Sequence, residues 1–325
     1  MPTASVTRYP TTIEQRPGAA PAGEGPLGRA ISAFVTCTVD GCQVVLDRAD
    51  GSQVTIPAPV ADTPVSLSPD GTRLVYLDRD ATVVRNLITG EVHRARPLLQ
   101  PISWSPDNRW LLSGLSQGSD FVVLDCMTGA VAVHEHPLPP SATAEPVEPV
   151  PTGPYFPGAV TDDGDIVRYP RPDTASTDAT FELDVVDRTT AKPRRTVVVR
   201  LNSPAGHVTP TWQSPSMLTL GGTAYVLSVW KGAAALLPVP LSGSPAQPPR
   251  PVAVSGPGPR PSLAVSHDDG AWQAVTALPR QGLVYRVPGV DGDDLIAVDP
   301  TTGRFRPLTH VHEGVRLALA ALEGP

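Results

Sequence analysis

Two pairs of histidines in this chain are spaced for metal binding. His134 and His136 flank a glutamate, and His310 and His312 are followed by Glu313. Residues two apart on a strand point to the same side of it, so each pair could reach one metal ion. Neither pair has an obvious third ligand nearby, and each lies beside a boundary between sequence repeats. We therefore interpret both pairs as exposed loop histidines, and we predict no metal ion and no cofactor.

Two other short motifs resemble known functional sequences. The Gly-Leu-Ser-Gln-Gly of residues 114–118 matches the elbow of serine hydrolases, where a turn between a strand and a helix exposes the nucleophile. Here residues 121–124 predict a strand where that elbow needs a helix, so we expect a chance match. The Asp-Gly-Asp-Asp of residues 291–294 lacks the ligand spacing and the final glutamate of an EF-hand. It predicts a polar hairpin turn.

Four aspartates occupy the same position of a recurring turn motif. Asp70 and Asp107 stand in Ser-Pro-Asp-Gly and Ser-Pro-Asp-Asn, while Asp163 and Asp269 stand in looser Asp-Asp-Gly versions. Proline presets φ, aspartate hydrogen-bonds its own backbone, and glycine or asparagine accepts positive φ, so each motif predicts a tight turn between two strands. Equivalent positions of successive repeats stand apart from one another. We therefore expect structural carboxylates and predict no catalytic residue.

Cys37 and Cys42 are the pair of side chains that could form a covalent link. The four residues between them end in Asp-Gly, which predicts a hairpin turn and places the two thiols opposite one another. A disulfide is expected if the protein meets an oxidising environment, and two free thiols are expected in a reducing cytosol. Cys126 has no evident partner.

The composition favours turn-rich β structure. Apolar residues make up 40% of the 325 residues and charged residues 18%, and the chain contains 40 prolines and 28 glycines. Proline removes a helix donor and glycine raises the entropy cost of ordering, so this composition argues against a helical protein.

The charge pattern and the hydropathy exclude two classes of partner. The formal net charge is -7 and no basic residues cluster, so a nucleic-acid partner is not expected. No run approaches the roughly 18 consecutive apolar residues that cross a bilayer, and the first 30 residues lack an apolar signal core. We expect a soluble, cytoplasmic protein without a membrane span. An extracytoplasmic form is the alternative.

The predicted elements are short strands that begin near Ile31. Residues 1–30 carry Pro, Gly, Thr and Ala without periodicity, so they predict a flexible or extended tail ahead of one domain over residues 31–325. Within that domain, residues 64–96 contain four apolar runs, at 65–67, 73–77, 82–88 and 91–93, separated by turn residues. Residues 101–136 repeat this pattern.

A second punctuation mark recurs within these units. It places Asp or Asn four positions before Gly, and it stands before the last short strand of a unit. It occurs at Asp47–Gly51, Asn86–Gly90, Asp125–Gly129 and Asp299–Gly303, and Asp187–Ala191 keeps the spacing without the glycine. A four-stranded unit that recurs about every 40 residues is the sequence signature of a propeller blade.

On these turns and this strand order, the chain resembles the TolB-like and WD40-like propellers. In those proteins a Ser-Pro-Asp-Gly turn joins the innermost strand of each blade to the next strand. The resemblance covers about residues 31–325, and it implies an all-β propeller. The Gly-His and Trp-Asp dipeptides of strict WD40 repeats are missing, so TolB-like is the closer description. Because the turn occurs in proteins of many functions, the resemblance implies little about activity.

Counting the units predicts a six-bladed propeller. The complete units are 64–96, 101–136, 157–200, 208 to about 254, and 262–309, and an incomplete unit at 31–57 lacks an innermost strand. We expect Val315–Leu322 to supply that strand by pairing near Ala33–Cys37, which closes the ring and removes two open sheet edges. A short C-terminal helix is the alternative for this segment. The strand division of the unit at 208–254 stays open.

Function is the least determined property. We expect a non-enzymatic binding or scaffold protein that engages a protein, peptide or glycan through loops on one rim. The alternative is a propeller enzyme, such as a lactonase or a lyase, with a site at the mouth of the central channel. Three loops depart from the repeat, namely Pro137–Gly158, Tyr169–Asp178 and Gly289–Asp294. Strand order places all three on the rim away from the Ser-Pro-Asp-Gly turns. The oligomeric state is not predicted.

Overall fold

The computed structural model describes most of the chain, and its secondary structure there consists of strands. The described residues are 12–39, 41–59, 63–96, 98–115, 121–134, 157–168, 180–203, 206–210, 217–256, 272–278, 282–288, 292–312 and 317–319. Among these residues, none form a helix with the length and apolar character needed to span a bilayer.

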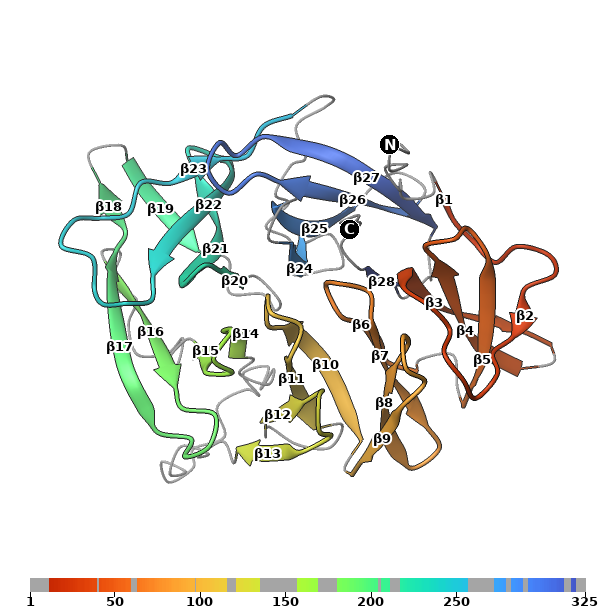
Figure 1. Ribbon diagram of the computed structural model, residues 1–325. Helices are drawn as coiled ribbons and strands as arrows, with labels where there is room; N and C mark the ends of the chain where they lie inside the picture. The colour runs from red at the N-terminus through yellow and green to blue at the C-terminus, as the bar shows by residue number, and fades with distance from the viewer. Residues whose placement is uncertain are drawn as a thin grey trace, which may run out of the picture.

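Six sheets stand around a common centre, and each is built from antiparallel strands at its core (Figure 1). The chain is a six-bladed β-propeller. The strands of each blade are given from the innermost outward: blade I contains β28 (Leu317–Leu319), β3 (Ala30–Thr38), β4 (Gly41–Arg48) and β5 (Gln53–Ala58), and blade II contains β6 (Val65–Leu67), β7 (Arg73–Asp78), β8 (Ala81–Asn86) and β9 (Val92–Ala95). Blade III contains β10 (Leu99–Trp104), β11 (Trp110–Leu115), β12 (Phe121–Asp125) and β13 (Val131–His134), and blade IV contains β14 (Pro157–Val160), β15 (Ile166–Arg168), β16 (Thr180–Val186) and β17 (Pro193–Arg200). Blade V contains β20 (Met217–Leu220), β21 (Thr223–Trp230), β22 (Ala233–Pro240) and β23 (Val252–Ala253), and blade VI contains β24 (Gln273–Leu278), β25 (Gly282–Pro288), β26 (Gly292–Val298) and β27 (Phe305–His312).

The hydrophobic core is divided among the six interfaces between neighbouring blades. Blades I and II share one cluster that includes Leu46 and Leu74, and blades III and IV share another that includes Trp110 and Ile166. The remaining four clusters lie between blades II and III, IV and V, V and VI, and VI and I. Because both faces of a blade are covered, a middle strand such as β12 is buried along its whole length. This explains the continuous apolar runs in the sequence.

The Ser-Pro-Asp-Gly turns form as expected, and they also connect neighbouring blades. In blade II, Ser68 Oγ and the Thr72 N–H both donate to Asp70 Oδ1, at 2.6 and 3.0 Å. The Asp70 N–H then donates to Asn108 Oδ1 of the next turn at 2.7 Å. In the same way, the Asp107 N–H donates to Asp162 Oδ1 of blade IV at 2.9 Å. The turns therefore link three successive blades along one rim, which we call the turn rim.

One glycine on the turn rim is required by its surroundings. Gly164 has a φ of +82°, and a Cβ there would lie 2.8 Å from the Trp110 ring and 2.7 Å from Arg188. Arg188 lies 4.5 Å from the centre of that ring, and Arg109 lies 4.4 Å from it. Trp110 thus makes cation–π contacts with one arginine of its own blade and one of the next blade.

The second punctuation mark also caps turns on this rim, with one exception. The carboxylates of Asp187 and Asp299 each accept two backbone N–H groups of their own turn. The exception is Asp47, which is 1% exposed and whose carboxylate binds side chains. Its carboxylate accepts from Ser32 Oγ at 2.6 Å and from Gln53 Nε2 at 2.8 Å, and it pairs with Arg16 at 2.6 Å.

Arg16 belongs to the segment for which the sequence predicts a flexible or extended tail. Residues 12–30 lie against the propeller, while residues 1–11 are outside the described residues. β1 (Thr12–Ile13) pairs in parallel with β27 of blade VI, and β2 (Ala20–Pro21) pairs in parallel with β5 of blade I. Farther along, the N–H groups of Leu27 and Gly28 both donate to the Leu87 carbonyl of blade II. We call residues 12–30 the N-terminal strap, because they run across three blades.

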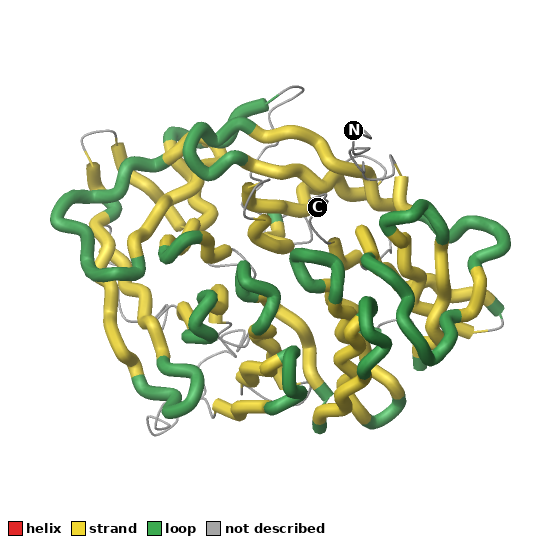
Figure 2. The backbone as a smooth tube through the Cα atoms, in the orientation of Figure 1, coloured by secondary structure: helices red, strands yellow, loops and turns green. Residues whose placement is uncertain are grey.

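The C-terminal strand completes blade I. β28 pairs antiparallel with β3, so that Leu317 lies opposite Phe34 and Leu319 opposite Ser32. Blade I therefore contains residues from both ends of the described chain, as the labels of β28 and β3 in Figure 1 show. Figure 2, in the same orientation, shows the described chain as strands joined by loops and turns.

Blades V and VI differ from the simple repeat. In blade V, β19 (Gly206–Pro210) and β20 both pair with β21, so the edge toward the centre is interrupted, and β18 (Asn202–Ser203) pairs with β19. In blade VI, the motif at His267–Gly270 lies outside the described residues, but it precedes the innermost strand β24 instead of following it. The link from first to second strand in that blade falls at residues 279–281, which are also outside the described residues.

A truncation tests whether β28 stabilises the ring. A chain that ends at Gly314 lacks β28 and exposes the inner edge of β3, so we expect it to aggregate or to lose at least about 5 °C of Tm. A chain that ends at Leu322 keeps β28 and serves as the control. Equal thermal unfolding of both chains, measured by circular dichroism, would show that the pairing does not stabilise the ring.

The hydrogen bond between the turns of blades III and IV predicts that replacing Asp162 stabilises the fold in a pH-dependent way. Partial desolvation and the neighbouring Asp107 carboxylate raise the pKa of Asp162. A carboxyl whose pKa is raised on folding destabilises the fold when ionised, above that raised pKa, and not when protonated. Asp162→Asn keeps the acceptor for the Asp107 N–H, so it should raise the free energy of unfolding near neutral pH by about 0.3–0.5 kcal/mol. The gain should shrink as the pH falls through the pKa of Asp162.

Asn108→Asp is the matched control for this prediction, because Asn108 holds the equivalent acceptor one blade earlier. It should show a loss of similar size near neutral pH. Urea unfolding of both variants at several pH values makes the measurement, and a gain for Asp162→Asn that persists at acid pH would contradict the electrostatic explanation.

Candidate binding site

The structure does not bring the histidine pairs into a metal site among the residues that it describes. The interpretation of the histidines as loop residues is wrong for three of them, because His134 ends β13 and both His310 and His312 lie in β27. His136 lies beyond the described residues. His310 Nδ1 lies 2.9 Å from Asp294 Oδ1 on the neighbouring strand of blade VI. Within the described ranges, no three His, Cys, Asp or Glu side chains are placed to hold one metal ion.

The two other motifs overlap the ends of strands, and the hairpin turn predicted for residues 291–294 is wrong for residues 292–294, which form the start of β26. β11 ends at Leu115 and β12 begins at Phe121, so the Gly-x-Ser-x-Gly match has a strand on either side, and residues 116–120 are outside the described residues. In the acidic motif of blade VI, Asp293 pairs with Arg286 and Asp294 with His310. These carboxylates are therefore paired with side chains of neighbouring strands, and Asp291 lies outside the described residues.

The three repeated aspartates that the structure describes do not converge on one site. Asp70 and Asp107 stand in successive turns of blades II and III, and each accepts hydrogen bonds from its own turn. In blade IV, the backbone carbonyl of Asp163 accepts from Arg188. Asp269 lies outside the described residues.

Cys37 and Cys42 lie directly opposite one another in the β3–β4 hairpin, with Cα atoms 4.0 Å apart, and the structure joins them in a disulfide. Their oxidation state in the cell depends on the compartment and stays a prediction. Cys126 is free and buried, and burial raises the pKa of its thiol.

Strand order defines a second rim, which we call the loop rim. It carries the links from second to third strands and the links from one blade to the next. The three loops that depart from the repeat start or end here, between His134 and Pro157, between Arg168 and Thr180, and between Pro288 and Gly292. Of the three loops as predicted, residues 157–158 lie in β14 and residues 292–294 in β26, and the other loop residues are outside the described residues.

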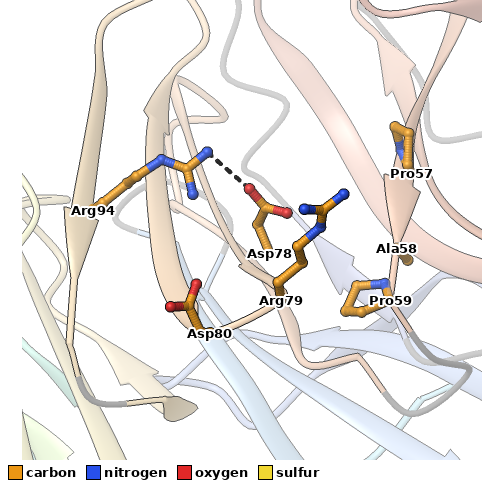
Figure 3. A pocket seen from close by; sticks show the side chains of 7 residues that line it. All are labelled: Pro57, Ala58, Pro59, Asp78, Arg79, Asp80 and Arg94. Atoms are coloured by element: carbon orange, nitrogen blue, oxygen red, sulfur yellow. Dashed lines mark ion pairs between the residues drawn. The ribbon is translucent and has the colours of Figure 1, made fainter.

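A hollow of about 630 Å³ opens on the loop rim between blades I and II (Figure 3). Pro57, Ala58 and Pro59, at the end of β5, form one side. The other side is formed by the β7–β8 turn and by β9, with Asp78, Arg79, Asp80 and Arg94. In Figure 3, the Arg79 guanidinium extends from the turn toward the strand that carries Pro57.

The charges around the hollow are incompletely paired. Arg94 binds Asp78 at 2.8 Å, and this hydrogen bond and the Asp78 charge raise the pKa of Arg94. Asp80 lies 3.6 Å from Arg96. Arg79 makes no hydrogen bond or ion pair with any described residue. The hollow therefore presents one guanidinium whose charge the surrounding carboxylates do not take up.

Arg79 also has an unusual backbone conformation. Asp78 and Ala81 pair at the end of the β7–β8 hairpin, which leaves a two-residue loop of Arg79 and Asp80. The φ of Arg79 is +53°, in the left-handed region that glycine or asparagine usually occupies in such loops. Lys231 has a φ of +52° in the corresponding β21–β22 loop of blade V.

Sequence reasoning missed this hollow, although one signal was present. The Arg79–Asp80 pair separates two strands without the Gly or Asn that a two-residue hairpin loop prefers. Backbone outliers of this kind concentrate at functional sites. The sequence alone could not predict that Pro57, Ala58 and Pro59 of blade I form the other wall, because only the arrangement of the blades in the ring brings them near Arg79.

Comparison with known proteins does not assign the chain to a family. No family model matches the chain, and no curated protein is similar to it at a significant level. Solved structures that resemble it include a putative TolB from Agrobacterium tumefaciens (13% identity, TM-score 0.45, 88% of this chain and 91% of that one). Others are an acylaminoacyl peptidase from Pyrococcus horikoshii (14%, 0.43, 87% and 51%) and a chain of a nidogen/laminin complex (13%, 0.43, 89% and 97%). This chain thus spans about half the length of the peptidase.

The conformation of Arg79 predicts an unusual response to glycine. Arg79→Gly removes the roughly 1 kcal/mol cost of a left-handed non-glycine residue, which offsets the roughly 0.5–1 kcal/mol that glycine loses in backbone entropy. We expect the free energy of unfolding to stay unchanged or to rise by up to about 1 kcal/mol. Asp80 does not have a positive φ, so Asp80→Gly should lower it by at least about 0.5 kcal/mol. Chemical denaturation of both variants makes the comparison, and a clear loss for Arg79→Gly would mean that its side chain stabilises the fold.

Proposed function

We propose that this protein is a non-enzymatic binding propeller that engages a partner through its loop rim. The single observation that carries the proposal is the hollow between blades I and II, with its uncompensated Arg79 guanidinium. It lies on the rim where the three irregular loops attach to their strands. Concave sites with a few placed polar groups are the usual form of a recognition site.

The contrast between the two rims supports this choice. On the turn rim, the turns bind one another, and Trp110 and its two arginines fill the space between blades III and IV. These side chains already have partners within the fold. The loop rim combines the connections that vary most between blades with a cation that has no partner among the described residues. Variation on a rigid scaffold is where recognition residues concentrate.

Loop replacement tests the proposed rim. The segments between His134 and Pro157, Arg168 and Thr180, and Pro288 and Gly292 are each replaced by a short Gly-Ser link. Folding should be nearly intact, because a twofold change in loop length costs only about 0.6 kcal/mol. Capture of partners from an extract of the source organism should be lost. If capture survives all three replacements together, this rim does not bind the partner.

A matched pair of cross-linking positions identifies the rim independently of the loops. Val39, in the β3–β4 hairpin, is 103% exposed on the loop rim, and Ile88, in the β8–β9 turn, is 48% exposed on the turn rim. A photo-reactive residue at position 39 should label the partner, and the same residue at position 88 should not. Equal labelling from both positions would contradict the proposal.

A further inference from the structure

The hollow beside Arg79 indicates what chemical group the loop rim recognises. We propose that it binds a peptide carboxylate, either a C-terminal carboxylate or the side chain of an aspartate or glutamate. This inference rests on the proposed binding role and gives it a chemical class.

The charges around the hollow favour an anionic ligand. Three guanidinium groups, of Arg79, Arg94 and Arg96, stand around two carboxylates, of Asp78 and Asp80. Asp78 is held by Arg94, and Asp80 is beside Arg96, which leaves one positive charge at Arg79. An anion can therefore enter the hollow without displacing an existing ion pair.

The geometry of the Arg79 side chain favours a carboxylate among anions. A guanidinium presents its N–H groups in a planar fork that matches the two oxygens of a carboxylate. Arg79 stands at the tip of a hairpin with its side chain directed across the hollow (Figure 3). Its positive φ fixes where that side chain leaves the backbone.

The wall of the hollow opposite Arg79 favours a peptide as the carrier of that carboxylate. Pro57, Ala58 and Pro59 offer a small apolar surface, and none of the described residues that line the hollow is aromatic. Aromatic faces are the large flat surfaces on which a sugar ring can stack, so their absence from the lining favours a peptide over a glycan. Pro57 also has no N–H to donate to an added strand. The hollow is thus suited to a side chain or chain end with a carboxylate next to a small apolar group.

Titration of isotope-labelled full-length protein with small peptides tests the inference by NMR. One pair of probes is N-acetyl-Ala-Ala-Ala with a free C-terminal carboxylate and its C-terminal amide. The other is N-acetyl-Ala-Glu-Ala-amide and its Gln counterpart. We expect at least one of the two acids to shift the Arg79 side-chain N–H resonance saturably, with a Kd of about 1 mM. The amide and the Gln peptide should not, and the acid that binds identifies the source of the carboxylate.

Matched variants identify the residue. Arg79→Gln should weaken binding of that acid at least tenfold, and Arg79→Lys, which keeps the charge without the fork, should lie between it and the native protein. Lys231→Gln is the control, because Lys231 is a basic residue at the corresponding position of blade V with nearly the same φ. It should leave the Kd unchanged within twofold.

Three results would overturn the inference: equal shifts with the neutral peptides, an unchanged Kd in Arg79→Gln, or saturation by glucuronate at tenfold lower concentration than either acid. If neither acid binds while cross-linking from position 39 still exceeds that from position 88, the carboxylate inference fails and the loop rim stands. If the two positions label equally, the binding role itself fails, whatever the titration shows.

Discussion

Face-to-face packing of each blade on its two neighbours is the constraint on which the rest of the structure depends. The apolar side chains of one sheet meet those of the next, as Leu46 of blade I meets the cluster of Leu74 in blade II, and this repeats at every interface. A blade removed from the ring would expose two apolar faces, so no blade has a core of its own. All of these apolar faces are buried only when the ring is closed. The interface between blades VI and I, where Phe34 packs with Leu278, must therefore form as completely as the others.

Polar groups at the two rims have different relations to this packing. On the turn rim, Asp70 and Asp107 organise their own turns, and their N–H groups donate hydrogen bonds to the next blade. Neighbouring blades are therefore joined there by polar contacts as well as by their apolar faces. On the loop rim, Arg79 stands outside any such connection. The disulfide lies close to the hollow, because Cys42 pairs with Ala58 of its apolar wall. The β3–β4 hairpin is thereby fixed beside the place where we propose that a carboxylate binds.

The fold was largely predictable from local chemistry, and the site was not. Motifs such as Ser68–Gly71 indicate a turn by residue type alone, and their spacing reveals the blade. The strap was missed because β1 and β2 are two residues long, too short for any periodicity, and Arg16 meets Asp47 only through tertiary contact. Asp47 has the spacing of a turn cap, and only the presence of Arg16 and Gln53 shows its other role. The hollow joins Pro57 of one blade to Arg79 of another, and no sequence window contains both.

The strap and β28 close the ring at two different distances from its centre. β28 joins the innermost position of blade I, and β1 joins the outer edge of blade VI, so opposite ends of the described chain secure the same interface. Blades II to VI are each built from consecutive residues, so their strands can pair in order as the chain leaves the ribosome, while the packing between blades is completed only when the ring closes. Blade I cannot, because it waits for residues 317–319, and Thr12 and Ile13 wait for β27. During synthesis the protein is thus an open arc, whose first blade exposes the edge of β3 to any other strand nearby. Protection of that edge while the chain is incomplete is a requirement that this architecture places on the cell that makes it.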